Sequence, residues 1–256
     1  MAIIIKTKEE IESLREGGKR HAHILTVLSR AVRPGVSTGE LNRLAEELVR
    51  EGGDEAAFLG YKPYGAKRPY PASLCVSVND EIVHGIPSDE RILSEGDIVT
   101  LDLGLVHKGC ITDSAVTVPV GVTDRESKAL ITDTRKALEL GIKAIRPGGH
   151  VGDIGAAIEK YASLRGYGIV RELAGHGVGR HVHEDPYVPN YGEAGTGELL
   201  RPGMVIAIEP MLTLGGERIT LDADGYTYRT KDGSRSAHCE HTVLITEKGA
   251  EVLTSR

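Results

Sequence analysis

Apolar residues recur three and four positions apart in two separate stretches of the chain, the spacing of one face of an amphipathic helix. Ser37 and Glu40 stand before the first stretch with the spacing of a capping box, a common start signal for helices. The pattern therefore predicts a helix that begins after Ser37, and a matching helix in the later half of the chain. The apolar positions are Leu41, Leu44, Ala45, Leu48 and Val49 in the first stretch, and Ile154, Ala157, Ile158 and Tyr161 in the second.

A further helix is expected before each of these two, because the same start and stop signals occur twice. The candidate capping boxes are Thr7 with Glu10 and Thr123 with Glu126. The stop is an Arg-Pro-Gly sequence: the segment Ala31–Gly35 returns as Ala144–Gly148, 113 residues later. Since proline cannot continue a helix, each predicted helix ends there.

The repetition extends into the predicted strands. Leu93–Asp102 aligns with Leu200–Glu209 at an offset of 107, and each segment contains a turn glycine, a short apolar strand and a carboxylate. His84 also aligns with His183, and Asp113 with Glu240. We therefore predict an α+β fold in which a helix–helix–strand unit is duplicated with pseudo-two-fold symmetry, and we expect its chemistry where the halves meet. The expected arrangement is one domain over residues 1–256, with halves at about 8–120 and 121–250.

Two aspartates are predicted to lie close together in a hairpin formed by Ile98–Val106 and Cys110–Val118. If the turn centres on His107–Lys108, Asp102 and Asp113 face each other directly, whereas a bulge at the following glycine would shift the pairing by one residue. Facing carboxylates repel each other, so a nearby counter-charge is expected.

Glu209 and Glu240 are predicted to lie in similarly apolar strands, Glu209 at the end of one and Glu240 inside the next, so four acidic side chains share one pattern. Each alone is compatible with an edge or turn carboxylate that faces water. Together they favour a buried cluster that is neutralised by a shared proton or by metal ions. Two divalent cations balance four negative charges, and bridging carboxylates hold such ions about 3.5–4 Å apart.

A histidine in a glycine-rich segment is a candidate further ligand. His176 lies in the sequence Gly-His-Gly-Val-Gly, where the backbone passes close to its neighbours, whereas His21 and His23 are interpreted as ordinary helix residues. One imidazole with four carboxylates suits Mn, Fe, Co or Zn better than a thiolate-type zinc site. The sequence has no HExxH, Walker A or GxSxG motif.

Composition narrows the class of protein. Apolar residues make up 40% and charged residues 27% of the 256 positions, and the net charge of −6 argues against nucleic acid or anionic lipid as the main partner. No apolar stretch reaches the roughly 18 residues of a membrane span, and the start is too short for the core of a signal peptide. Three cysteines without a CxxC motif favour a reducing cytoplasm.

The residues Asp102, Asp113, His176, Glu209 and Glu240, in their local sequences, resemble the five metal ligands of type I methionine aminopeptidases of the short bacterial form, in the peptidase M24 family. The segment Val78–Pro87 is similar to the most specific stretch of that family, and the resemblance covers nearly the whole chain. It implies the "pita-bread" (creatinase/aminopeptidase) fold around a central antiparallel sheet.

The resemblance also implies roles. Asp102 would chelate the first ion, Asp113 and Glu240 would bridge both ions, and His176 and Glu209 would complete the second. The two ions could be Co, Mn, Fe, Zn or Ni. A bridging water would attack the methionyl carbonyl, with Glu209 as general base and His183 and His84 as contacts to the carbonyl oxygen and the leaving amide.

The expected substrate pocket departs from the usual family pattern. Val182 stands where a Phe is usual, Tyr226 where a Trp is usual, and Phe58 where a Cys is frequent. The pocket would still be apolar and suited to methionine, although its shape should differ. The remaining expected lining residues are Tyr61, Cys75, and either Tyr64 or Tyr70, together with His84 and His183.

The implied activity is removal of the initiator methionine from nascent chains with a small second residue, by a cytoplasmic monomer for which the ribosome is a candidate partner. Lys62, Lys67 and Arg68 could be a basic patch for docking or a solvated loop. Two alternatives share the fold: a proline-specific relative such as aminopeptidase P or prolidase, and a non-catalytic binding protein. The first usually carries a separate N-terminal domain, and the second tends to lose metal ligands.

Overall fold

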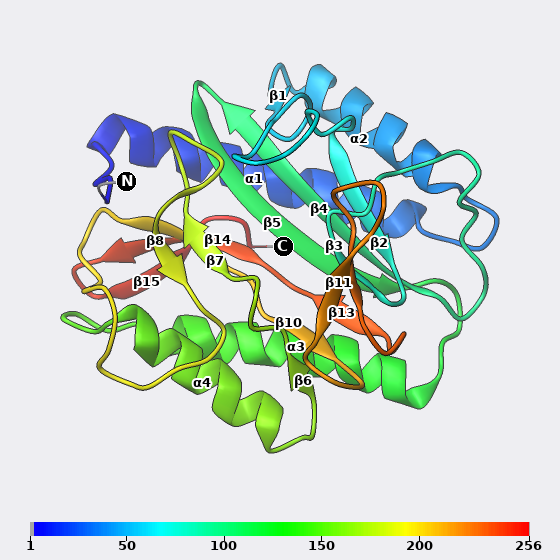
Figure 1. The fold of residues 1–256 in the computed structure, drawn as a ribbon. Helices are drawn as coiled ribbons and strands as arrows, with labels where there is room; N and C mark the ends of the chain where they lie inside the picture. The colour runs from blue at the N-terminus through cyan, green and yellow to red at the C-terminus, as the bar shows by residue number, and fades with distance from the viewer. Residues whose placement is uncertain (1–2, 256) are drawn as a thin grey trace.

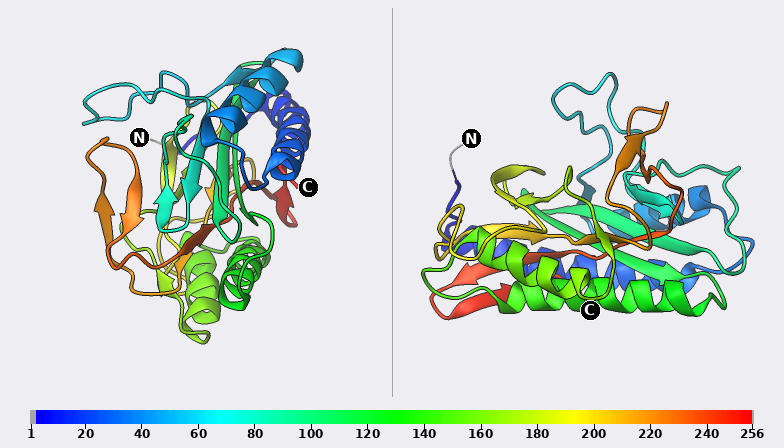
Figure 2. Two further views of the ribbon diagram at one scale, coloured as in Figure 1. Left: turned by 90° about the vertical axis from the view of Figure 1, so that its right-hand side faces the viewer. Right: turned by 60° about the horizontal axis from the view of Figure 1, so that its bottom comes forward.

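The structure is a computed structural model that describes residues 3–255. Within this range the four helices are α1 (Lys8–Ala31), α2 (Thr38–Glu51), α3 (Arg125–Lys143) and α4 (Val151–Ser163). In Figure 1, α1 and α2 lie toward the top of the view and α3 and α4 toward the bottom. The right-hand view of Figure 2 shows the helices on one side of the strands. The predicted helix pair is therefore present twice, and α2 and α4 begin 113 residues apart, at the offset of the sequence repeat.

Local sequence explains where these helices begin. Thr7 and Ser37 each accept a hydrogen bond from the backbone of the glutamate three residues on, and that glutamate bonds back, so both predicted capping boxes are confirmed. The predicted box at Thr123 is wrong by one residue, because Asp124 caps α3 and its carboxylate accepts from the backbone N–H of Ser127 at 2.8 Å. An ionised carboxylate is favoured at this position over the hydroxyl of Thr123 because it also interacts with the helix dipole.

The strands form two larger and two smaller sheets. The first larger sheet contains β1 (Glu55–Ala56), β4 (Ile98–His107) and β2 (Leu74–Val78), with β5 (Cys110–Pro119) paired to β4. The second contains β15 (Gly249–Val252), β14 (His241–Thr246), β9 (Val205–Ile208), β7 (Gly175–Gly177) and β8 (Glu184–Val188). The smaller sheets are β13 (Ser236–His238), β10 (Met211–Thr213) and β6 (Gly168–Ile169), and β11 (Ile219–Leu221), β12 (Tyr228–Thr230) and β3 (Glu81–Val83).

The two larger sheets meet along β5 and the segment from β13 to β14. The N–H of Asp113 donates to the Thr242 hydroxyl at 2.8 Å, and the N–H of Glu240 donates to the Ala115 carbonyl at 3.0 Å. Two acidic residues of the predicted cluster therefore come from strands that lie side by side at the junction. The paired strands of the described residues are antiparallel, as expected for the central sheet.

Each helix pair packs on its own apolar cluster. Leu25, Leu28, Leu41 and Ala45 of α1 and α2 pack in one cluster behind β2 and β4. In the other half, Leu130, Leu138, Ile154 and Ile158 of α3 and α4 pack in a second cluster with Ile206 and Val243. Each helix pair thus packs its apolar face against the strands of its own half. Among the described residues, no helix combines the length and apolar character needed to cross a bilayer.

The predicted register of the β4–β5 hairpin is wrong by two residues. Asp102 pairs with Ala115 and Gly104 pairs with Asp113, because the turn consists of Lys108 and Gly109. Both turn residues have positive φ, 49° and 76°, as a tight two-residue hairpin turn requires, and glycine adopts this conformation without steric cost. Asp102 and Asp113 are consequently diagonal neighbours on the same face rather than direct partners, at a spacing that side chains still bridge.

Candidate metal centre

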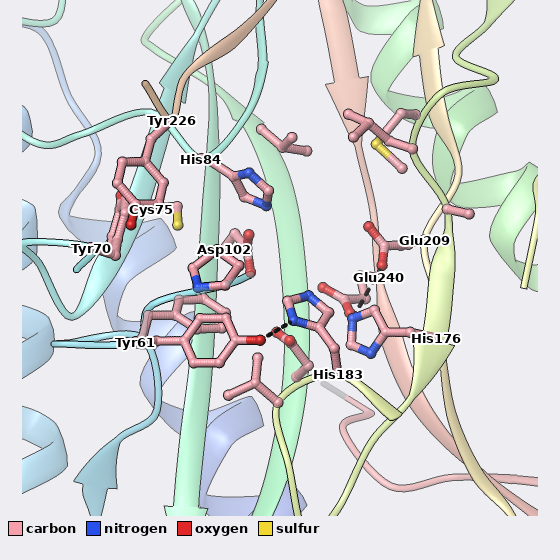
Figure 3. A pocket seen from close by; sticks show the side chains of 18 residues that line it. Tyr61, Tyr70, Cys75, His84, Asp102, His176, His183, Glu209, Tyr226 and Glu240 are labelled. Carbon is pink, nitrogen blue, oxygen red and sulfur yellow. Dashed lines mark hydrogen bonds and ion pairs between the residues drawn. The ribbon is translucent and has the colours of Figure 1, made fainter. Parts of the chain in front are cut away.

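Five strand or strand-end positions direct the predicted ligands toward one point. Asp102 lies in β4, Asp113 in β5 and His176 in β7. Glu209 follows the last residue of β9, and Glu240 precedes the first residue of β14. In Figure 3 the side chains of Asp102, His176, Glu209 and Glu240 point into a common space, and those of His176, Glu209 and Glu240 come from the second half of the chain.

The two glutamates lie where the pairing of their strands is interrupted. Ile208 pairs with His241, and beyond the interruption Met211 pairs with His238. Between these pairs neither strand is regular, and Glu209 and Glu240 lie in this gap. The prediction that Glu240 lies inside a strand is therefore wrong: it lies between β13 and β14. The break in the ladder lets both carboxylates turn toward the junction of the halves.

The distances identify a donor set for a cation. One potential ligand atom from each of Asp113, His176 and Glu240 lies within 4.8 Å of the others. Nε2 of His176 is 3.6 Å from Oε1 of Glu209. Oδ1 of Asp102 and Oδ1 of Asp113 are buried without a hydrogen-bond partner among the described residues. Buried carboxylate oxygens without donors are costly, and a cation would satisfy them, so this donor set fits a divalent metal ion.

Burial perturbs the acidity of the two aspartates. Loss of water raises the pKa of Asp102 to about 7, and loss of water together with repulsion by Asp102 and Glu209 raises the pKa of Asp113 well above its usual value. Burial acts in the same direction on Glu209, but the imidazoles of His238, His176 and His183 outweigh it and lower its pKa. Without a bound cation, the side chains around Asp102 and Asp113 therefore do not balance the negative charge that these two carboxylates carry when ionised.

Two further histidines face the cavity from opposite halves. His84, which follows β3, has φ of 60°, an unusual backbone conformation of the kind found at functional sites. Burial lowers its pKa to about 4. The ring of His183 lies 4.3 Å from that of His176, and its Nδ1 lies 2.8 Å from the Tyr61 hydroxyl. Burial and the adjacent His176 lower the pKa of His183 to about 3. The imidazole rings of His84 and His183 are therefore both neutral near pH 7.

A cavity of about 170 Å³ opens beside the carboxylates. Every residue predicted to bind substrate lines it, which brings together Phe58, Tyr61, Tyr70, Cys75, His84, Val182, His183 and Tyr226. Of the two alternative tyrosines, Tyr70 is buried in the cavity wall, whereas Tyr64 is fully exposed. Tyr70 packs edge-on against Tyr226, with ring centroids 5.2 Å apart (Figure 3).

The structure adds residues that sequence reasoning missed. Pro63, Val83, Leu173, Ala174 and Met211 also line the cavity and make it more apolar. His238 is the most informative addition, because its buried Nε2 lies 3.4 Å from Oε2 of Glu209. The spacing in the sequence could have indicated this histidine. His238 precedes Glu240 by two residues, and side chains two positions apart in an extended strand lie on the same face.

Comparisons with known proteins agree with this geometry. The model of metallopeptidase family M24 matches residues 12–247. A methionine aminopeptidase of Aquifex aeolicus is 45% identical over 99% of both chains. The crystal structure of a methionine aminopeptidase from Thermotoga maritima superposes with a TM-score of 0.94 at 45% identity over the full length of both chains.

More distant structures share the architecture. A prolidase from Pyrococcus furiosus is 26% identical with a TM-score of 0.77, and the match covers 99% of this chain and 66% of that longer one. The fold is accordingly the pita-bread fold that the sequence led us to expect. The family match over most of the chain and the full-length relatives lead to one conclusion: this chain belongs to metallopeptidase family M24.

Proposed function

We propose that this protein removes the N-terminal methionine from nascent proteins and peptides whose second residue is small. The observation that carries the proposal is the apolar cavity that ends on the clustered carboxylates and His176, in a chain that is similar over its full length to methionine aminopeptidases. The walls, which include Phe58, Tyr70, Cys75 and Met211, offer an apolar site for a long unbranched side chain.

The metal requirement follows from the family and from the donor set. We propose two divalent ions, held by the five residues Asp102, Asp113, His176, Glu209 and Glu240, with Co, Mn, Fe, Zn and Ni as candidates. When bound, such ions polarise a carbonyl group and make a coordinated water more acidic. Four carboxylates match the charge of two divalent ions, which supports this number.

The histidines then supply hydrogen bonds to the reacting peptide. When the Tyr61 hydroxyl donates to Nδ1 of His183, the ring proton lies on Nε2 and is available to a developing oxyanion. The low pKa of His183 favours this neutral, singly protonated ring. His84 lies across the cavity and would contact the amide on the leaving side, while Glu209 would accept and transfer a proton.

The wider setting of the reaction is also proposed. We infer one catalytic domain over residues 1–256, acting as a monomer in the cytoplasm on the N-termini of nascent chains, with the ribosome as a candidate partner. The exposed Lys62, Lys67 and Arg68 lie in the loop between β1 and β2 that borders the cavity through Pro63. Basic side chains near the mouth would favour an RNA-rich surface.

The decisive experiment compares three tripeptides with the metal-loaded protein. Release of methionine from Met-Ala-Ser is expected, with much slower release from Met-Leu-Ser and no cleavage of Ala-Pro-Ala. A chelator should abolish the activity, and divalent metal should restore it. Cleavage of Ala-Pro-Ala in preference to Met-Ala-Ser would support a proline-specific enzyme, and a metal-loaded protein inactive on all three would support a binding role.

A further inference from the structure

A buried ion pair joins the segment before α1 to the loop that carries His183. Nζ of Lys6 lies 2.5 Å from Oε2 of Glu184, and both side chains are only 1% exposed. The backbone N–H of Lys6 also donates to the Gly203 carbonyl at 2.9 Å, which fixes the segment beside the turn that leads into β9. Burying two charges is costly unless their geometry is good and their remaining polar atoms are satisfied.

The second oxygen of Glu184 is satisfied by the loop itself. Oε1 accepts hydrogen bonds from the backbone N–H groups of Arg180 at 2.6 Å and His181 at 3.0 Å. One carboxylate therefore closes the loop between Gly179 and Glu184, while Lys6 holds that carboxylate. The fit is close, since a Cβ atom on Gly179 would lie 2.3 Å from Cε of Lys6.

This loop determines where two residues of the cavity lie. Val182 and His183 precede Glu184 directly, and both line the cavity. Glu184 also begins β8 and pairs with Gly177, the neighbour of His176 in β7. A shift of Glu184 would therefore move the backbone of His183 and its contact with Tyr61.

We propose that Lys6 and Glu184 are positioning residues, which hold His183 where its ring meets the carbonyl oxygen of the substrate. This inference rests on the proposed function of the site. It assigns to Lys6 a role in catalysis although the Lys6 side chain does not line the cavity. Misplacement of a catalytic group by about 1 Å can reduce turnover about 100-fold, so a small shift of the loop suffices.

A second ion pair ties the same loop to α1 and provides a matched control. Nε of Arg180 lies 2.6 Å from Oε1 of Glu10, but the Arg180 side chain is 46% exposed. Solvent weakens such a pair, and exposed pairs contribute little. Arg180→Gln removes this ion pair and leaves the backbone N–H of residue 180 to bind Glu184.

The test combines Lys6→Met with His183→Ala in a double-mutant cycle on the metal-loaded protein. Lys6→Met is expected to lower kcat on Met-Ala-Ser about 10- to 100-fold, with little change in KM and in bound metal. In the His183→Ala background the same substitution should have almost no further effect, because residues that act through one another are not additive. Arg180→Gln should stay within about twofold of the wild type.

Thermal unfolding shows whether each variant is folded. If Lys6→Met does not fold, Glu184→Gln replaces it in the same double-mutant cycle. Glutamine at position 184 retains an oxygen that can accept hydrogen bonds from the loop N–H groups. The ¹⁵N signal of His183 should change in either variant and not in Arg180→Gln. Additive losses with an unchanged His183 signal would overturn the positioning role. A wild-type protein that releases no methionine would instead overturn the proposed function.

Discussion

Nε2 of His238 lies 3.4 Å from Oε2 of Glu209, whose other oxygen lies 3.6 Å from Nε2 of His176. Glu209 is thus held between two imidazoles, one from β13 and one from β7. His238 is buried and does not line the cavity, so it contacts the carboxylate of Glu209 without reaching the substrate site. Partners of this kind orient a metal-binding or proton-transferring carboxylate.

We expect His238→Leu to lower kcat/KM for Met-Ala-Ser about 10- to 100-fold, the usual cost of removing such a partner. His238→Gln keeps an N–H donor of similar reach and should retain more activity. The measurement is steady-state kinetics together with the metal content of each variant. His23→Leu, on α1, is the control and should have little effect. Equal activities of His238→Leu and the wild type would show that Glu209 does not need this contact.

Tyr70 supports the turn that carries His84. Its hydroxyl donates to the carbonyl of Gly85 at 2.9 Å, in a buried position next to the strained backbone of His84. Tyr70→Phe leaves that carbonyl without this donor, and we expect the free energy of unfolding to fall by about 1 kcal/mol. Methionine release should fall as well, because His84 loses part of its support.

The matched control is Tyr64→Phe, in the same loop, because Tyr64 is fully exposed. It should change neither urea unfolding nor kinetics. If both substitutions had the same effect, the buried hydrogen bond of Tyr70 would not be the cause.

Asp124 links the stability of α3 to acid pH. Hydrogen bonds from the backbone and side chain of Ser127, with the ion pair to Arg235, lower the pKa of Asp124 to about 2. A carboxyl group whose pKa is lower in the folded state stabilises the protein above the unfolded pKa, and this contribution is lost as the pH falls through the folded pKa. For Asp124 the loss should occur between the usual value of 3.8 and about 2.

We therefore expect Asp124→Asn to be less stable than the wild type at neutral pH and nearly equal to it near pH 2. Asparagine is itself a good N-cap, so the difference isolates the charge, whereas Asp124→Ala should be less stable at every pH. Urea unfolding from about pH 5 to about pH 2 measures the effect. A difference between Asn and Asp that does not vary with pH would exclude this carboxylate as the titrating group.

The helices and the duplication could be predicted from sequence because their signals are local. Capping boxes at Thr7 and Ser37 involve residues three positions apart, and α2 and α4 begin 113 residues apart, which is the offset of the sequence repeat. The local sequence does not determine the start of α3, because two neighbouring residues, Thr123 and Asp124, are both good caps and only the fold decides between them.

The candidate ligands could also be found from the sequence, but their geometry could not. The hairpin register depends on whether the two turn residues are His107 and Lys108 or Lys108 and Gly109. The second turn forms because both of its residues adopt positive φ angles, which the sequence pattern does not reveal. The contact of His238 with Glu209 joins two strands that are paired across an interruption, so it depends on long-range pairing. The same holds for Lys6 and Glu184, which are 178 residues apart in sequence.

The last prediction concerns the charge balance of the cluster. In the metal-free protein, burial and repulsion by Asp102 and Glu209 raise the pKa of Asp113. Above its unfolded pKa this side chain must either take up a proton or stay ionised, and both cost stability without a cation. Metal at 100 times its dissociation constant should stabilise the wild type by about 2.7 kcal/mol. Asp113→Asn removes one charge, so its metal-free form should unfold at the same temperature as the metal-free wild type or higher.

The same variant should nevertheless lose the stabilisation by metal and most of its activity, because an amide is a poor ligand in place of a bridging carboxylate. Thermal unfolding with and without Mn²⁺, and methionine release from Met-Ala-Ser, measure both effects. Glu198→Gln, at an exposed position, also removes one negative charge and is the control for a general effect of charge. Activity of Asp113→Asn within tenfold of the wild type, about 1.4 kcal/mol of barrier, would contradict a role of Asp113 between the ions. Undiminished stabilisation by metal would place the ions elsewhere.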